Sequence, residues 1–158
     1  MDGEARGGRT LELDGFLPYR LNRLAHAISR DLQAAYARRH QLTVPEWRTI
    51  ATLGQFGGLT ATAIGRHSAM HKTKVSRAVA ALEARRWVAR TVNDADRREA
   101  TVRLTPAGEV AYRDLSGIAL AFADRLLGPL PETDRNGIER AITLLEDRLG
   151  IDRSAPTG

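Results

Sequence analysis

Cysteine is absent from this 158-residue sequence, which excludes disulfides, thiolate metal sites and thiol-based redox sensors. Long apolar runs are absent as well, since none approaches the roughly 20 residues that a helix needs to cross a bilayer. The first nine residues are polar and glycine-rich and do not have the pattern of a signal peptide. We therefore expect a cytoplasmic protein that has no membrane partner.

Motifs for enzymatic chemistry are also lacking. The sequence holds no nucleophile elbow, no phosphate-cradling glycine loop and no His-Glu-x-x-His. His67 and His71 have the four-residue spacing of zinc ligands on a helix, but they straddle an expected turn, and no cysteine or nearby carboxylate completes a site. The sequence therefore predicts a protein that is not an enzyme and that has no cofactor or metal site.

Basic residues are concentrated in one segment. The chain has a net charge of +5, whereas residues 66–98 hold nine basic and three acidic side chains and so have a net charge of +6. Both lysines of the chain, Lys72 and Lys74, lie in this segment. Such a concentration of positive charge suits the neutralisation of nucleic-acid phosphates, although a solvated charged surface is the simpler alternative.

The centre of the basic segment predicts a helix with two different sides. At about 100° per residue the apolar side chains share one side: Val75, Val79 and Leu82. The opposite side carries small or polar side chains: Thr73, Ser76, Arg77, Ala80 and Ala84. A shorter helix with Thr60 as its N-cap precedes it, and residues 67–70 form a tight connection. Together these elements predict a helix-turn-helix whose second helix enters a DNA major groove.

Longer helices and a hairpin surround this motif. Apolar residues at helical spacing predict helices over residues 16–40, 44–56, 106–127 and 131–149, the last burying Ile138, Ala141, Ile142, Leu145 and Leu149. Residues 87–92 and 100–104 alternate as strands, and the charged residues 93–99 between them predict a loop. Two strands with a basic tip directly after a recognition helix form a wing.

The expected fold class is mainly α with a small β-wing, in which a winged helix-turn-helix module is flanked by long dimerisation helices. The expected divisions are a disordered tail (1–14), a dimerisation helix (15–44), the winged module (45–105), the C-terminal dimerisation helices (106–150) and a second tail (151–158). Residues 118–122 are apolar almost all the way round their helix, which requires burial on more than one side. A homodimer with twofold symmetry supplies that burial.

Four segments of the sequence resemble the MarR (multiple antibiotic resistance regulator) family of winged helix-turn-helix transcriptional regulators. They are residues 42–48, residues 70–79, Leu82-Glu83, and Asp94-Ala-Asp-Arg-Arg98 followed by Val102-Arg-Leu-Thr-Pro-Ala-Gly108. The last pair is specific, and the resemblance covers about residues 17–149. The sequence departs from the family pattern at His71, where aspartate is common, and at Ala69, where glycine is common.

The resemblance implies that the recognition helix binds double-stranded DNA. Bases would be read through Thr73, Ser76 and Arg77, with Arg77 a candidate for the O6 and N7 atoms of guanine. Lys72 and Lys74 would hold phosphates. His71 could contact a phosphate when it is protonated. A plain solvent-facing hydroxyl is the alternative interpretation of Ser76.

The resemblance also implies a role for the wing. Arg98 would reach the minor groove, because arginine favours narrow, electronegative A·T grooves. Asp96 would orient that guanidinium, and Arg97 would contact the DNA backbone or substitute for Arg98.

Many regulators that this sequence resembles respond to a small effector, here expected to be an aromatic or phenolic acid or its coenzyme A thioester. The candidate lining residues come from the first two helices: Arg20, Asn22, Arg23, His26, Trp47 and Arg48. Core burial is the alternative for Trp47, and dimer-interface salt bridges are the alternative for His26 and the arginines. The expected function is that of a homodimeric repressor released from a pseudopalindromic operator by its effector. The alternative is a winged-helix protein-interaction module without DNA binding, against which the basic segment argues.

Overall fold

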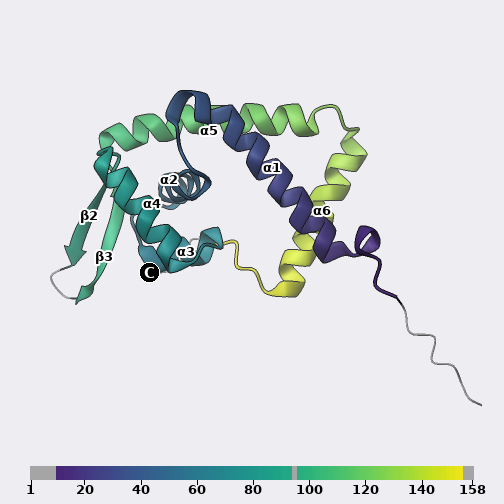
Figure 1. Ribbon diagram of the computed structural model, residues 1–158, viewed down its shortest axis with the longest axis horizontal. Helices are drawn as coiled ribbons and strands as arrows, with labels where there is room; N and C mark the ends of the chain where they lie inside the picture. Colours follow the sequence, from purple (N-terminus) through teal and green to yellow (C-terminus); the bar gives the residue numbers. More distant parts are fainter. Residues whose placement is uncertain (1–9, 94–95, 155–158) are drawn as a thin grey trace, which may run out of the picture.

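The computed structural model describes residues 10–93 and 96–154, with the backbone alone for residues 93 and 96–99. Within these ranges the chain forms six α-helices and a small sheet, so the predicted fold class is confirmed (Figure 1). The order is η1 (Leu13–Gly15), α1 (Leu17–His40), α2 (Val44–Phe56), β1 (Leu59–Thr60), α3 (Ala61–Ser68), α4 (Lys72–Ala84), β2 (Val88–Asn93), β3 (Asp96–Leu104), α5 (Pro106–Leu127) and α6 (Glu132–Leu149). None of the helices in these ranges is long and apolar enough to cross a membrane.

Three of the helices begin at a threonine that caps free backbone N–H groups, as the sequence predicts. Thr43 Oγ1 accepts from the Glu46 N–H at 3.4 Å, and Glu46 Oε2 accepts from the Thr43 N–H at 2.8 Å. This reciprocal capping box fixes the start of α2. Thr60 and Thr105 cap α3 and α5 in the same way, each accepting at 3.1 Å. These local contacts determine the residues at which α2, α3 and α5 begin.

The sheet is antiparallel with the strand order β1-β3-β2, and β1 adds a third strand that the sequence did not predict. Leu59 pairs with Val102, and Thr91 pairs with Thr101. The prediction of a loop over residues 93–99 was wrong, because β2 runs to Asn93 and β3 begins at Asp96. Paired backbone groups therefore extend the wing far beyond the core (Figure 1).

One apolar core joins the winged module to its flanking helices. Tyr36 of α1 and Leu115 of α5 are each 1% exposed and belong to the same buried cluster as the module's side chains, including Ile50, Leu53, Ile64, Val75, Val79, Leu82, Val88 and Val102. Burial raises the pKa of the Tyr36 hydroxyl to about 12, although the positive charge of Arg48 acts to lower it. The shared core packs α1 and α5 directly against the winged module.

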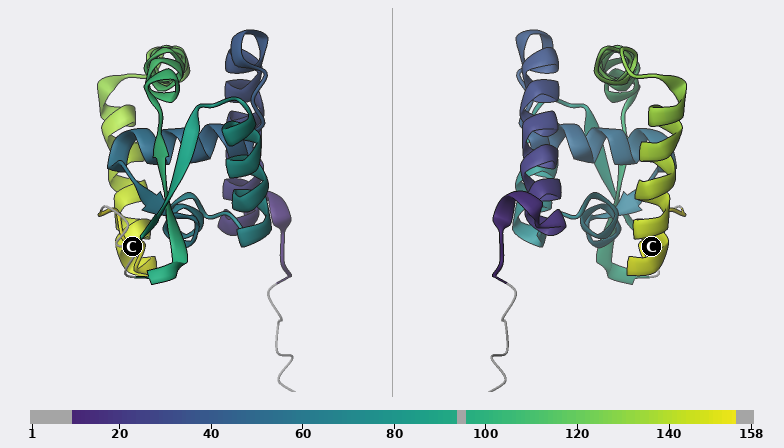
Figure 2. Two further views of the ribbon diagram at one scale, coloured as in Figure 1. Left: turned by 90° about the vertical axis from the view of Figure 1, so that its left-hand side faces the viewer. Right: turned by 90° about the vertical axis from the view of Figure 1, so that its right-hand side faces the viewer.

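Helix α6 leaves this core. In both views of Figure 2, α6 and α1 stand apart, with the sheet and α2 between them. None of the α6 residues is buried, so the predicted burial of Ile138, Ala141, Ile142, Leu145 and Leu149 is wrong for a single chain. Val110 of α5 is 59% exposed as well, whereas its neighbour Ala111 is buried. The apolar pattern of α6 needs a covering surface from elsewhere.

Candidate nucleic-acid interface and adjoining groove

Helix α4 presents the two sides that its sequence predicts. Four of its side chains are buried in the core: Val75, Ala78, Val79 and Leu82. The opposite side is exposed and carries Thr73, Ser76, Arg77, Ala80 and Ala84. Because its side chains are short apart from Arg77, this face can approach another macromolecule closely. Short polar side chains on an exposed helix face are of the kind that can contact base edges in a major groove.

The turn before α4 adopts the geometry of a helix-turn-helix without the usual residues. Ala69 ends α3 in the left-handed conformation with φ 52°, which glycine adopts at lower cost. His71 is the N-cap of α4, and its side chain makes no capping hydrogen bond. The two departures noted in the sequence therefore leave the turn intact and leave the first N–H groups of α4 without a side-chain cap. Backbone N–H groups at a helix N-terminus suit a phosphate.

The exposed cations of α3 and α4 are available for a ligand. Within the described part of the chain, Arg66, Lys72, Lys74 and Arg77 make no ion pair, and all four are exposed. Arg90 at the base of the wing differs, because its Nε lies 3.2 Å from Glu83 Oε2 of α4. These unpaired cations thus gather around the exposed face of α4 that carries Thr73, Ser76, Arg77, Ala80 and Ala84, which we call the reading face.

The wing residues Asp96, Arg97 and Arg98 lie on the backbone of β3, close to the tip of the hairpin. Their side chains lie outside the described residues, as does Asp94. The antiparallel pairing of β2 with β3 places the base of the wing directly after α4 and residues 96–98 at its far end. Their predicted roles in the minor groove stay predictions.

A groove of about 450 Å³ separates α1 from the helix-turn-helix. Three of the predicted effector residues line it, namely Asn22, His26 and Arg48. The other lining residues come from α1, from the start of α2 and from the turn into α4: Ala25, Ser29, Arg30, Gln33, Val44, Pro45, Ala69, Met70, His71 and Lys74. This lining contains five side chains that are or can become cationic and no carboxylate, although Arg30 Nε also lies 3.1 Å from Asp31. The groove suits an anion.

The structure does not bring the other three candidates to this groove. Arg20 and Arg23 line a different hollow with Asp14, and Arg23 Nη1 lies 3.4 Å from that carboxylate. Trp47 packs against Tyr36 with ring centroids 5.6 Å apart, which matches the core alternative. Arg30 and Lys74 were missed as lining residues. Helical spacing from Asn22 and His26 would have indicated Arg30, whereas Lys74 reaches the groove only through the tertiary fold.

The two histidines considered as a zinc pair are engaged differently. His67 packs edge-on against Phe56 with ring centroids 4.6 Å apart, while His71 lies at the start of α4 beside the groove. Among the described residues, no group of three or more histidine, aspartate or glutamate side chains is placed to hold a metal ion.

Comparisons with known proteins agree with this geometry. A family model described as "MarR family" matches residues 40–99. The MarR family transcriptional regulator SPO1453 from Silicibacter pomeroyi DSS-3 is 31% identical, covers 89% of this chain and 99% of its own, and superposes with a TM-score of 0.77. The search of curated proteins found no match.

Two further solved structures share the fold at lower identity. BpsR from Bordetella bronchiseptica is 20% identical over 87% of this chain and 98% of its own, with a TM-score of 0.76. PcaV from Streptomyces coelicolor, solved with its natural ligand, is 18% identical over 87% of this chain and 96% of its own, with a TM-score of 0.71. Together with the winged helix-turn-helix described above, the match to SPO1453 shows that the chain belongs to the MarR family of transcriptional regulators.

Proposed function

We propose that this regulator is a homodimeric repressor that binds a pseudopalindromic operator and is released from it by a small aromatic acid. The observation that carries the proposal is the exposed face of α4, where Thr73, Ser76 and Arg77 are free of the core. Lys72 and Lys74 flank it and make no ion pair with any described residue. The hydroxyls and the guanidinium would read bases, while the lysines would hold phosphates.

Exposed apolar surface on the long helices supports the dimer. Large hydrophobic side chains on α1, α5 and α6 are between 37% and 73% exposed: Leu17, Leu21, Leu24, Leu120, Leu126, Leu127, Ile138, Ile142, Leu144 and Leu149. A monomer in water would leave this surface hydrated, which is unfavourable in proportion to its area. A second copy would cover it and would hold two recognition helices about one DNA turn, ~10 bp, apart.

The effector is proposed to occupy the groove between α1 and α4. A carboxylate would meet Arg48 and the groove's other cations, while apolar atoms of Val44, Pro45 and Met70 would face a ring. BpsR, which shares the fold, has its DNA binding regulated by 6-hydroxynicotinic acid. Lys74 borders both this groove and the reading face, so an occupant would act directly on the position of α4. A ligand that prefers mis-spaced recognition helices would shift the population away from DNA.

The salt dependence of binding to a duplex of random sequence tests the proposal. Two lysines from each of two subunits would neutralise at least about four phosphates, so log K should fall with log salt with a slope of about −4 or steeper. Replacing Lys72 and Lys74 with alanine should make the slope shallower by about that amount. A dimer that does not bind duplex DNA at ~50 mM salt would instead support the protein-interaction module.

Thermal unfolding with 6-hydroxynicotinic acid tests the effector groove. A ligand present at 100 times its Kd stabilises the folded state by about 2.7 kcal/mol, so the Tm should rise with concentration. Arg48→Ala should require a concentration about tenfold or more higher for the same shift, because it removes a charge-assisted contact. Arg113→Ala removes an equal charge from α5 and serves as the control. Equal responses of the two variants would place the ligand outside the groove.

A further inference from the structure

The C-terminal end of the recognition helix is tied to the end of α1. Arg85, the residue that follows α4, donates from Nη1 to the His40 carbonyl at 2.7 Å and from Nη2 to the Gln41 carbonyl at 2.9 Å. Carbonyl groups at a helix C-terminus have no partner within the helix, and the helix dipole favours a cation there. The guanidinium also lies over the Trp87 ring, 5.2 Å from its centroid. Both of its terminal nitrogens are therefore engaged within the protein.

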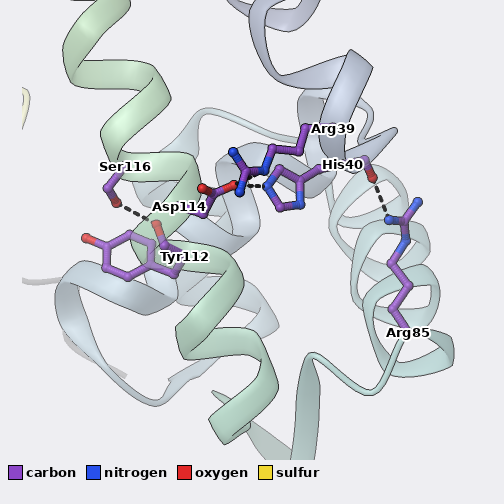
Figure 3. A network of polar contacts seen from close by, with 6 residues as sticks. All are labelled: Arg39, His40, Arg85, Tyr112, Asp114 and Ser116. Atoms are coloured by element: carbon purple, nitrogen blue, oxygen red, sulfur yellow. Dashed lines mark hydrogen bonds and ion pairs between the residues drawn. The ribbon is translucent and has the colours of Figure 1, made fainter.

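The same end of α1 is bound to α5 through side chains. His40 Nε2 lies 2.5 Å from Asp114 Oδ2, and Arg39 Nε lies 3.0 Å from the same oxygen. The His40 side chain is only 13% exposed, and its ring packs edge-to-face with that of Trp87 at a centroid distance of 5.8 Å. Figure 3 shows Asp114 facing both basic side chains, while Arg85 approaches the His40 carbonyl from the other side. His40 is thus the point at which α1, α4 and α5 meet.

The opposite end of α4 is held differently. His71 and Lys74 border the groove that separates this end from Asn22 and His26 of α1. Across that gap, no hydrogen bond or ion pair joins a described side chain of α4 to α1. The recognition helix is therefore fixed to the long helices at its C-terminal end and separated from them at its N-terminal end.

We propose that the junction of Arg85 with His40 and Gln41 is the fulcrum about which α4 tilts relative to α1. This inference rests on the proposed function, in which the separation of two recognition helices decides operator binding. Arg85 is then a positioning residue that contacts no DNA. Its planar fork holds two carbonyls at once, which fixes an angle as well as a distance. An occupant of the groove would press on the N-terminal end of α4, which no hydrogen bond or ion pair of a described side chain ties to α1, while the junction keeps the other end in place.

Operators of altered spacing test the junction. The duplex enriched by in vitro selection with the wild-type protein is compared with versions that have one base pair added or removed at the centre. Arg85→Gln should lower affinity for the selected spacing by about tenfold and should reduce the penalty for altered spacing. Arg85→Lys keeps the charge but not the fork, so it should resemble Arg85→Gln. Arg86→Gln removes the neighbouring exposed charge and should affect all spacings equally.

A measurement without DNA completes the test. Because the chain has no cysteine, Ala80→Cys on the exposed face of α4 can carry a single spin label in each subunit. Arg85→Gln should broaden the distribution of distances between the two labels, and Arg86→Gln should leave it unchanged. Rescue of the spacing preference by Arg85→Lys, or an unchanged distance distribution in Arg85→Gln, would overturn the junction's role while leaving the proposed function in place. Failure of the wild-type dimer to bind duplex DNA would remove the proposed function itself.

Discussion

Replacing Gly108 with alanine is expected to lower the free energy of unfolding by about 3 kcal/mol or more. Gly108 lies in the first turn of α5, and a Cβ atom there would lie 1.9 Å from the Trp87 carbonyl oxygen and 2.9 Å from the carbonyl carbon. These are backbone atoms that cannot rotate away. The Trp87 carbonyl accepts from the Thr105 N–H at 3.0 Å, and the Trp87 N–H donates to Leu82 at 3.0 Å. The start of α5 would therefore have to move away from Trp87, the residue that precedes β2.

Chemical denaturation of the purified protein measures this effect, and α5 itself offers the control. Gly117 lies nine residues further along the helix, is exposed, and has no atom within 4 Å of the position a Cβ would take. Gly117→Ala should therefore stabilise the protein by about 0.5–1 kcal/mol, because glycine loses more backbone entropy on folding. If Gly108→Ala were as stable as the wild type, the close approach of α5 to Trp87 would not exist in solution.

Gly108 also shows what the sequence can and cannot reveal. The segment from Leu104 to Gly108 was recognisable as a family pattern, and Thr105 was predictable as a cap because capping depends on residues three positions apart. The reason for the glycine was not visible, because the atom it avoids belongs to Trp87 on a different element. Local rules gave the helix starts and the two sides of α4, which the burial of Val75 and Val79 confirms.

Contacts between distant segments account for the features that were missed. Strand β1 has two residues, too few for a period-2 pattern, and it exists only because β3 pairs with it. Arg85 reaches His40 across 45 positions of sequence, so no spacing rule connects them. The apolar side chains on one side of α6 also show what sequence periodicity leaves open. Its periodicity correctly indicates an amphipathic helix but does not say whether its own chain or a second copy covers the apolar side.

The candidate effector residues divide for a geometric reason. Asn22 and His26 are one turn apart and face the groove, whereas Arg20 lies about 200° round the helix from Asn22 and faces another hollow. Residue type alone favoured all of the arginines. Helical phase separates them, and it would have placed Arg30 with His26, since four positions bring two side chains to one face.

Arg77→Ala is expected to weaken binding to the selected operator by about 1–3 kcal/mol, or roughly 5- to 150-fold. The Arg77 side chain is exposed at the centre of the reading face and makes no ion pair within the described ranges, so its removal costs the folded protein little. A guanidinium can donate two hydrogen bonds to guanine, one to O6 and one to N7. No other base presents two acceptors in this geometry in the major groove.

The identity of the lost contact separates base reading from simple charge loss. If Arg77 reads a guanine, substitution of that one base pair should cost the wild type about 1–3 kcal/mol and cost Arg77→Ala almost nothing, because the two changes remove the same contact. Loss of a phosphate contact would instead weaken binding to all sequences by a similar factor. Arg113→Ala on α5 removes the same charge far from the reading face and should bind as the wild type does. Additive losses at every operator position would show that Arg77 holds the backbone, and sequence reading would then fall to Thr73, Ser76 and the wing.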